Sequence, residues 1–297
     1  MARPERDERI SPGPEGPAPT PEITPGRSLP AAVATALVLL GIIIVSYFLD
    51  VETEVPAFFI LICAVVLIAL FELLDALVQT GRRPSILFGL ACGAAMLIVG
   101  FYERPAYFGV VLAVAMYGAF ILALRPNRGR TPISDVAWTL LGVAWVSGGG
   151  AAAVLISRLG TEETGLQLLI AFVLVTALDD IGAYFVGTTL GRHKMAPSIS
   201  PAKSWEGVIA GFPTAILGGL LFAALVDPLD VIDGIALAGI AGFLAPVGDL
   251  VESMAKRQIG IKDSGRLLPG HGGLLDRLDA ILFCAPAAFL YLRFVVF

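Results

Sequence analysis

The sequence predicts an all-α fold: a polytopic integral membrane protein with about nine transmembrane helices and a cytoplasmic N-terminus. Hydrophobic residues make up 57% of the 297-residue chain and charged residues 15%, whereas a soluble domain usually carries about 25% charged residues. The mean hydropathy is +0.84. Apolar residues gather in runs of about 20, the length at which a helix spans the hydrocarbon core of a bilayer. Composition and arrangement together exclude a soluble protein.

Each predicted span is an apolar run bounded by polar or proline-containing segments. The runs are 31–49, 56–78, 85–102, 107–124, 136–156, 166–190, 207–226, 231–251 and 278–297. Only Glu103, Arg104 and Pro105 separate the third run from the fourth. A helix of this length is about 30 Å long, which matches the thickness of the hydrocarbon layer.

The basic residues orient these spans. All of the 20 Lys and Arg residues except Arg104, Arg158 and Arg293 fall in the segments 1–30, 79–84, 125–135, 191–206 and 252–277. Because Lys and Arg accumulate in cytoplasmic loops, we assign these segments to the cytoplasm, which requires an odd number of spans. We expect a multi-pass protein of the cell inner (plasma) membrane, with its active site facing the cytoplasm.

Three regions follow from this pattern. Residues 1–28 are Pro-rich, polar and without a long apolar core, which predicts a disordered cytoplasmic tail and not a signal peptide. Residues 29–165 form N-terminal transmembrane helices, in which Gly148, Gly149 and Gly150 permit close helix approach. Residues 166–297 form the C-terminal catalytic transmembrane region with two cytoplasmic loops. The three cysteines, Cys63, Cys92 and Cys284, lack metal-type spacing and are interpreted as packing residues.

Carboxylates inside or at the ends of the spans indicate function, because ionised groups are costly in hydrocarbon. Asp179 and Asp180 lie inside the sixth run, and their different helical directions predict that one faces the site and the other a neighbouring helix or water. Tyr184 and Gly187 share the face of Asp180, where the small residues Gly182, Ala183 and Gly187 leave room for a groove.

Two further helix ends each offer a pair of acidic residues. Asp249 and Glu252 share a face at the end of the eighth run, and Asp276 and Asp279 open the ninth with the same spacing. Hard oxygen ligands beside cationic side chains are what a Mg²⁺–phosphate site needs. Ion pairs remain an alternative: Glu252 and Asp279 with Lys256 and Arg277, and Glu72 and Asp75 in the second run with Arg82 or Arg83.

The first cytoplasmic loop, 191–207, presents a lysine at the start of a helix. Ser204 is a candidate cap for that helix and Glu206 lies in its first turn, where a carboxylate favours the helix dipole. Lys203 stands just before the helix N-terminus, which is a natural place to hold phosphate. Arg192 and Lys194 are explained equally well as positive-inside charges.

The second loop, 253–279, combines cations, glycines and a carboxylate. Its cations are Lys256, Arg257, Lys262, Arg266 and Arg277, and arginine forks match phosphate oxygens. Gly270, Gly272 and Gly273 expose backbone N–H groups that can form an anion-binding nest, with His271 as a further donor and Asp276 close behind. The residues alone therefore predict a membrane enzyme that handles a phosphorylated, metal-bound substrate.

This loop resembles the signature of the phosphatidate cytidylyltransferase (CDP-diacylglycerol synthase) family, S-x-x-K-R-x4-K-D-x-G-x2-[LIF]-P-x-H-G-G-x-x-D-R-x-D, and residues 253–279 match every fixed position. Residues 200–207 are similar to the family's S-P-x-K-[ST]-x-E-G segment, and residues 180–184 to its D-[ST]-x-A-Y element. One departure is Ile181, where the family usually has a hydroxyl residue. The resemblance covers residues 170–297 by motif.

The resemblance implies an all-helical, Mg²⁺-dependent enzyme that forms homodimers and transfers CMP from CTP onto phosphatidic acid, releasing pyrophosphate. The implied metal ligands are Asp249, Asp276 and Asp180, and the implied catalytic residues are Asp249, Asp276, Asp279, Lys203 and Lys262. The implied substrate-binding residues are Lys256, Arg257, His271, Gly272, Gly273, Arg277, Ser200, Ser253 and Tyr184. Expected partners are CTP, phosphatidic acid and membrane lipids, with no nucleic acid.

Two other functions fit the sequence less well. Another CTP-dependent membrane lipid enzyme, such as a polyprenol kinase or an ether-lipid CDP synthase, is the nearest alternative, because lipid tails leave no trace in sequence. A cation-coupled transporter with intramembrane carboxylates is the alternative of a different class. Its inverted repeats are not visible here, since the polar residues concentrate in the C-terminal half.

Overall fold

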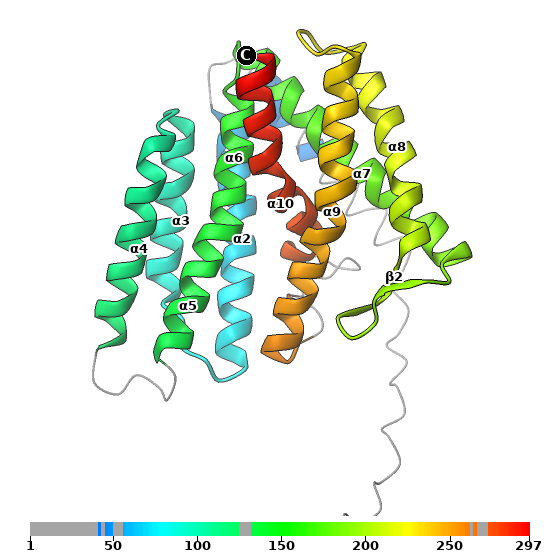
Figure 1. Cartoon of the computed structure of the whole chain (residues 1–297). Coiled ribbons are helices and arrows are strands. Elements are labelled where there is room, and N and C mark those ends of the chain that lie inside the picture. Colours follow the sequence, from blue (N-terminus) through cyan, green and yellow to red (C-terminus); the bar gives the residue numbers. More distant parts are fainter. Residues whose placement is uncertain (1–40, 43–44, 50–55, 125–131, 262–263, 266–272) are drawn as a thin grey trace, which may run out of the picture.

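The protein is described here by a computed structural model covering residues 41–42, 45–49, 56–124, 132–261, 264–265 and 273–297. Its α-helices are α2 (Ala57–Gln79), α3 (Ile86–Phe101), α4 (Phe108–Ala123), α5 (Pro132–Gly142), α6 (Gly148–Ser157), α7 (Glu162–Leu190), α8 (Trp205–Ala223), α9 (Val231–Ile259) and α10 (Leu275–Tyr291). The short elements are η1 (Pro105–Tyr107), η2 (Val143–Ser147), η3 (Leu292–Val296), β1 (Lys194–Ala196) and β2 (Ser200–Ser204). Figure 1 shows the helices running side by side as a bundle.

The bundle confirms a polytopic membrane protein. Within the described residues, seven helical segments are long and apolar enough to cross a membrane, and α3 is a shorter apolar helix. Every predicted span from 56–78 onward coincides with one of these helices. The predicted span 31–49 lies mostly outside the described residues, as does the tail 1–28, so the total of nine spans stays a prediction.

Two helices are longer than their apolar runs. α7 and α9 each have 29 residues, and α9 continues to Ile259 before Gly260, at φ 89°, ends it in a left-handed conformation. Ser253, Lys256 and Arg257 were predicted in a loop and are helical instead. Hydropathy marks only the apolar part of a helix. Met, Ala, Lys, Arg and Gln are good helix formers, and basic residues in the last turn favour the helix dipole.

The segment before α8 departs from the all-α prediction. β1 and β2 form an antiparallel hairpin, in which Lys194 pairs with Ser204. The predicted cap is confirmed, because the Ser204 hydroxyl accepts the N–H of Gly207 at 3.3 Å. Glu206 does more than favour the helix dipole: its carboxylate accepts the N–H of Arg192 at 3.2 Å and lies 2.5 Å from Nδ1 of His193. These contacts close the hairpin against the helix.

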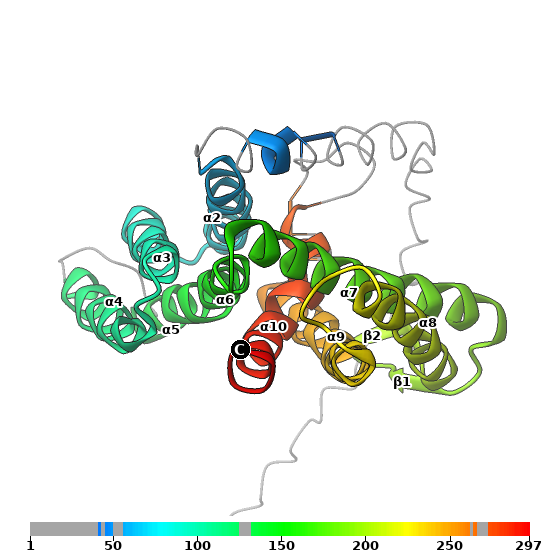
Figure 2. The same ribbon diagram turned by 90° about the horizontal axis from the view of Figure 1, so that it is seen from above.

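Small residues bring the helices around α10 into close contact. A Cβ added to Gly149 would lie 2.2 Å from the Leu282 carbonyl oxygen, and one added to Gly150 would lie 2.6 Å from a Val66 methyl. The predicted role of these glycines is confirmed. α10 packs against α6 on one side and α9 on the other, and Figure 2 shows it between the group α2–α6 and the group α7–α9. The three cysteines are free thiols, two of them fully buried.

Candidate active site

Three helices carry the acidic residues to one level inside the bundle. Asp180 on α7 lies about 15 Å along the helix from its end at Leu190, and Asp249 on α9 lies about 15 Å from Ile259. α10, which carries Asp276 in its first turn, begins part-way up the bundle in Figure 1, whereas α9 ends at its lower edge. Asp249 is therefore recessed from the end of α9, and not placed at it as the apolar run predicted, whereas Asp180 lies inside α7 and Asp276 opens α10 as predicted.

Lys256 joins α9 to α10. Its ammonium donates to Glu252 Oε2 at 2.8 Å and to Asp276 Oδ1 at 3.0 Å, and its side chain is only 16% exposed. The hydroxyl of Ser264 donates to Glu252 Oε1 at 3.0 Å and also bonds Asp276. The N–H of Gly273 donates to the other Asp276 oxygen at 3.0 Å. Both oxygens of Asp276 are thus fixed by hydrogen bonds.

Lys203 reaches the same region from the hairpin. It forms an ion pair with Asp249, 46 residues away in the chain, and both side chains are mostly buried at 23% exposure. Asp279 is buried and lies beside both Asp249 and Glu252. The hairpin, α9 and α10 therefore contribute to one cluster.

The two neighbouring aspartates of α7 face different ways, as predicted. Asp179 is 1% exposed, and a Cβ added to Gly211 of α8 would lie 2.7 Å from its Oδ1. Among the described residues, neither of its carboxylate oxygens has a hydrogen-bond partner. Asp180 is exposed and is an electrostatic neighbour of Asp249, Lys203 and Arg277. Asp179 is also an electrostatic neighbour of Asp249 and Lys203, but its side chain is buried against α8.

We predicted a groove beside Asp180 where Gly182 and Gly187 leave room, and the structure shows that this room is filled. A Cβ added to Gly182 would lie 2.2 Å from the hydroxyl oxygen of Thr214 on α8, and one added to Gly187 would lie 3.3 Å from the hydroxyl of Ser204. Their small size is used to pack α7 against α8. Tyr184, on the face of Asp180, is 68% exposed and lines the outer surface of α7.

The cluster holds more carboxylates than cations. Its acidic residues are Asp180, Asp249, Glu252, Asp276 and Asp279, and they face Lys203, Lys256 and Arg277. Among the described residues no group of three His, Cys, Asp or Glu side chains is arranged to hold a metal ion. Carboxylate oxygens are nevertheless the ligand type that Mg²⁺ prefers, together with substrate phosphates. Five carboxyl groups of the cluster thus share three cationic side chains.

The comparison with known sequences identifies the family. A sequence model described as "Cytidylyltransferase family" matches residues 30–295. The chain belongs to this family. A protein named phosphatidate cytidylyltransferase from Brucella suis is 39% identical over 214 residues, covering 72% of this chain and 75% of its own length.

Two other relatives are similar to this chain over different lengths. A protein of the same name from Mycobacterium bovis is 34% identical to this cytidylyltransferase over 283 residues, covering 90% of this chain and 89% of its own length. An uncharacterized protein from Escherichia coli, YnbB, is 43% identical over 147 residues, 48% of each chain.

The remaining predicted site residues of this cytidylyltransferase are placed in part. Ser253 is half-buried on α9, Arg257 is exposed and donates to the Ile261 carbonyl at 3.5 Å, and Arg277 is exposed on α10. Ser200 opens β2. Lys262, His271 and Gly272 lie outside the described residues.

The structure brings two more residues to the cluster. The sequence interpretation missed Ser264, which bonds both Glu252 and Asp276 and stands at a variable position of the signature. Glu72 of α2 accepts the N–H of Leu275 at 3.0 Å. An ion pair of Glu72 with Arg82 or Arg83 was the alternative left open, and Arg82 instead donates to the Gln258 carbonyl at 3.1 Å.

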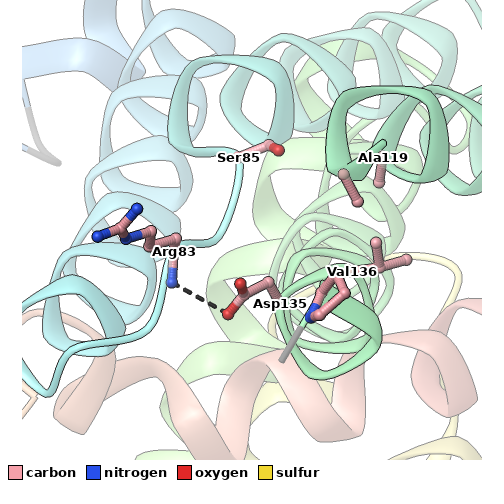
Figure 3. A pocket seen from close by; sticks show the side chains of 7 residues that line it. Arg83, Ser85, Ala119, Asp135 and Val136 are labelled. Carbon is pink, nitrogen blue, oxygen red and sulfur yellow. Dashed lines mark hydrogen bonds between the residues drawn. The ribbon is translucent and has the colours of Figure 1, made fainter. Parts of the chain in front are cut away.

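A separate pocket lies between α4, α5 and the connection from α2 to α3 (Figure 3). Its volume is about 10 Å³, roughly the room that one water molecule needs. Asp135 on its wall accepts the N–H of Arg83 at 3.0 Å. None of the predicted site residues that the structure describes lines this pocket, which is too small for a nucleotide.

Proposed function

We propose that this cytidylyltransferase transfers CMP from CTP to phosphatidic acid, releasing pyrophosphate and giving CDP-diacylglycerol for phospholipid synthesis. The family match and two relatives named phosphatidate cytidylyltransferase support this reaction. The structural observation that carries it is the cluster in which Asp276 of α10 meets Lys256 of α9, with Asp249 and Lys203 paired beside it. Lys203, Lys256 and Asp276 belong to the segments that resemble the family signature, and Asp249 stands four residues before the longest of them.

The reaction needs neutralised charge more than a general base. A phosphate oxygen of phosphatidic acid attacks the α-phosphorus of CTP, a new P–O bond forms, and the bond from the α-phosphorus to the bridging oxygen breaks as pyrophosphate leaves. The nucleophile is already an anion, so the obstacle is the meeting of two polyanions. Transfers of this kind depend mainly on positioning and electrostatic stabilisation. Lys203 and Lys256 supply mobile positive charge for this purpose, and Arg257 and Arg277 supply planar donors for phosphate oxygens.

Mg²⁺ is the proposed cofactor. Asp249, Asp276 and Asp180 would hold it, with Asp279 as a supporting carboxylate, and it would neutralise phosphate charge when bound. In the structure Lys203 pairs with Asp249 and Lys256 with Asp276. The same lysines are then close enough to contact the phosphates that approach the cluster.

The depth of the cluster suits a substrate with one soluble and one lipid component. A phosphatidic acid headgroup can meet Asp180 and Lys203 while its acyl chains stay in the bilayer beside the exposed face of α7, where Tyr184 and Ile181 lie. The ends of α2 and α9 and the hairpin lie at one end of the bundle in Figure 1, and the basic segments follow them in sequence. We therefore place this end in the cytoplasm, with the protein in the inner (plasma) membrane as a homodimer.

The decisive assay is CMP transfer by purified protein. Mixed micelles containing phosphatidic acid, Mg²⁺ and CTP labelled in its cytosine are incubated with the native protein, with Asp276→Ala, or with Asp75→Asn as a variant outside the cluster. We expect label in the lipid fraction for the native protein and Asp75→Asn, and a loss of at least about 100-fold for Asp276→Ala. Parallel samples replace phosphatidic acid by an ether lipid phosphate, or by a polyprenol together with CTP labelled in its γ-phosphate, since a kinase would transfer that phosphate and not the cytosine. Label entering only those lipids would contradict the phosphatidic acid assignment.

A further inference from the structure

Glu72 of α2 connects the N-terminal half of the bundle to the cluster. Its carboxylate is 4% exposed, and Oε2 accepts the N–H of Leu275 at 3.0 Å across 203 residues of sequence. The N–H of Leu274 also faces this carboxylate. Both donors stand at the start of α10, immediately before Asp276.

The start of α10 needs acceptors from elsewhere. Leu274, its N-cap residue, offers no side-chain hydrogen bond, whereas the first N–H groups of any helix lack partners within the helix and carry its positive dipole end. Asp276 takes the N–H of Gly273 at 3.0 Å. Glu72 takes the N–H of Leu275, and its negative charge is favourably placed at this end of the helix. A side chain of α2 thus completes the cap of α10.

Glycines enclose the Glu72 carboxylate. A Cβ added to Gly265 would lie 2.4 Å from Glu72 Oε1, and one added to Gly273 would lie 3.0 Å from Glu72 Oε2 and 2.8 Å from the backbone nitrogen of Gly265. These two glycines flank residues 266–272, so Glu72 touches both sides of that segment. Glu72 Oε1 is buried and has no hydrogen-bond partner among the described residues. A buried acceptor is costly to leave unused, so the position of this oxygen calls for an explanation.

We propose that Glu72 is a positioning residue for the proposed reaction. It fixes the start of α10 and the two glycine segments, and so holds Asp276 in reach of Lys256. The inference rests on the proposed function, because Asp276 matters for that reaction. It also gives α2, which carries none of the signature residues, a part in building the site. Groups that orient a catalytic carboxylate commonly change activity by about 10- to 100-fold when they are removed.

The test compares Glu72→Ala and Glu72→Gln with the matched control Asp75→Asn. Asp75 lies on the same helix, one turn further on, and accepts only from Gln79, at 2.6 Å, among the bonds found for it in the described residues. Hydrogen–deuterium exchange is followed for the backbone amides of 274–276, and kcat and the KM for phosphatidic acid are measured in micelles. The exchange measurement reports on the cap without requiring any activity.

We expect the amides of 274–276 to exchange about 10-fold faster or more in Glu72→Ala, because a hydrogen bond to a charged group is lost. The kcat should fall about 10- to 100-fold, with the KM for phosphatidic acid within about twofold of native. Glu72→Gln keeps an acceptor oxygen and should retain the exchange protection. Asp75→Asn should match the native protein in both measurements.

Three results would overturn the inference. The first is native exchange at 274–276 in Glu72→Ala, and the second is equal exchange in Glu72→Gln and Glu72→Ala. The third is faster exchange spread over all helices in both variants, which would make Glu72 a general packing residue. If the native protein transfers no CMP, the proposed function fails while the exchange comparison still decides whether Glu72 caps α10.

Discussion

The pairing of Lys256 with two carboxylates makes a quantitative prediction. Its ammonium lies 2.8 Å from Glu252 and 3.0 Å from Asp276, and the Glu252 side chain is only 4% exposed. At about 3 Å and an effective dielectric constant of about 20, each contact corresponds to about 5–6 kcal/mol of attraction before desolvation is subtracted. Removal of one partner from a buried ion pair costs about 3–5 kcal/mol net, because the other charge stays buried. We expect Lys256→Met to lose about that much stability.

A double-mutant cycle separates this charge effect from a loss of packing. Thermal unfolding is measured in detergent for the native protein, Lys256→Met, Glu252→Gln and the double variant. Lys256→Met should lower the midpoint by about 6 °C or more, at roughly 2 °C or more per kcal/mol. Glu252→Gln should restore part of this loss in the Lys256→Met background, with a coupling energy of about 1–3 kcal/mol. In the double variant, Ser264 and the N–H of Gly273 would still bond Asp276.

The reasoning would be refuted by a midpoint shift below about 2 °C for Lys256→Met, which corresponds to no more than about 1 kcal/mol. It would also be refuted by additive effects in the cycle. Either result would mean that the carboxylates of α9 and α10 need no neutralising charge from Lys256. The carboxyl groups of the cluster would then not need cations to lie close together. The physical argument for Mg²⁺ at this place would be wrong as well.

Two further predictions test the hairpin and the helix packing. Lys203→Met should lower kcat/KM in the CMP-transfer assay by about 100-fold or more, since Lys203 pairs with Asp249 inside the cluster. Lys194 is an exposed lysine of the same hairpin, and Lys194→Met should keep the native kcat/KM. Gly149→Ala should lower the thermal midpoint in detergent, because its Cβ would lie 2.2 Å from the Leu282 carbonyl oxygen, at an overpacking cost of about 1–3 kcal/mol. Gly148→Ala should leave the midpoint unchanged or raise it slightly, because the nearest atom to its Cβ would be 3.9 Å away. Equal effects within either pair would contradict the placement of Lys203 or of Gly149.

The apolar runs predicted the positions of the helices well and their ends less well. Burial in hydrocarbon requires about 20 apolar residues, so each run from 56–78 onward marked a helix. A helix does not end where its residues become polar, and α9 therefore carries Glu252 and Lys256 on regular turns. The hairpin of β1 and β2 was not predicted, because a short antiparallel pair leaves little periodicity in a sequence. Its ladder and the contacts of Glu206 depend on tertiary geometry.

The site was predictable where its residues are neighbours in the chain. Asp276 and Asp279 at the start of one helix, or Asp249 and Glu252 on one face, follow from helical spacing. The bond between Lys203 and Asp249 joins residues 46 positions apart, and although each residue was a candidate by itself, nothing in the sequence marked one as the partner of the other. The depth of the cluster could not be predicted either, because it depends on where α10 begins relative to the ends of α7 and α9.

Glu72 shows why one class of site residue escapes sequence interpretation. A carboxylate one turn from Asp75, and within reach of Arg82 and Arg83, has an adequate explanation as a local ion-pair partner. Its actual partner, the N–H of Leu275, is a backbone group, and backbone groups have no residue type that could signal the contact. The only trace in the sequence is indirect: Gly265 and Gly273 are glycines where the Glu72 carboxylate leaves no room for a Cβ. Signature glycines near a site therefore merit a search for the side chain that occupies their space, wherever in the chain it originates.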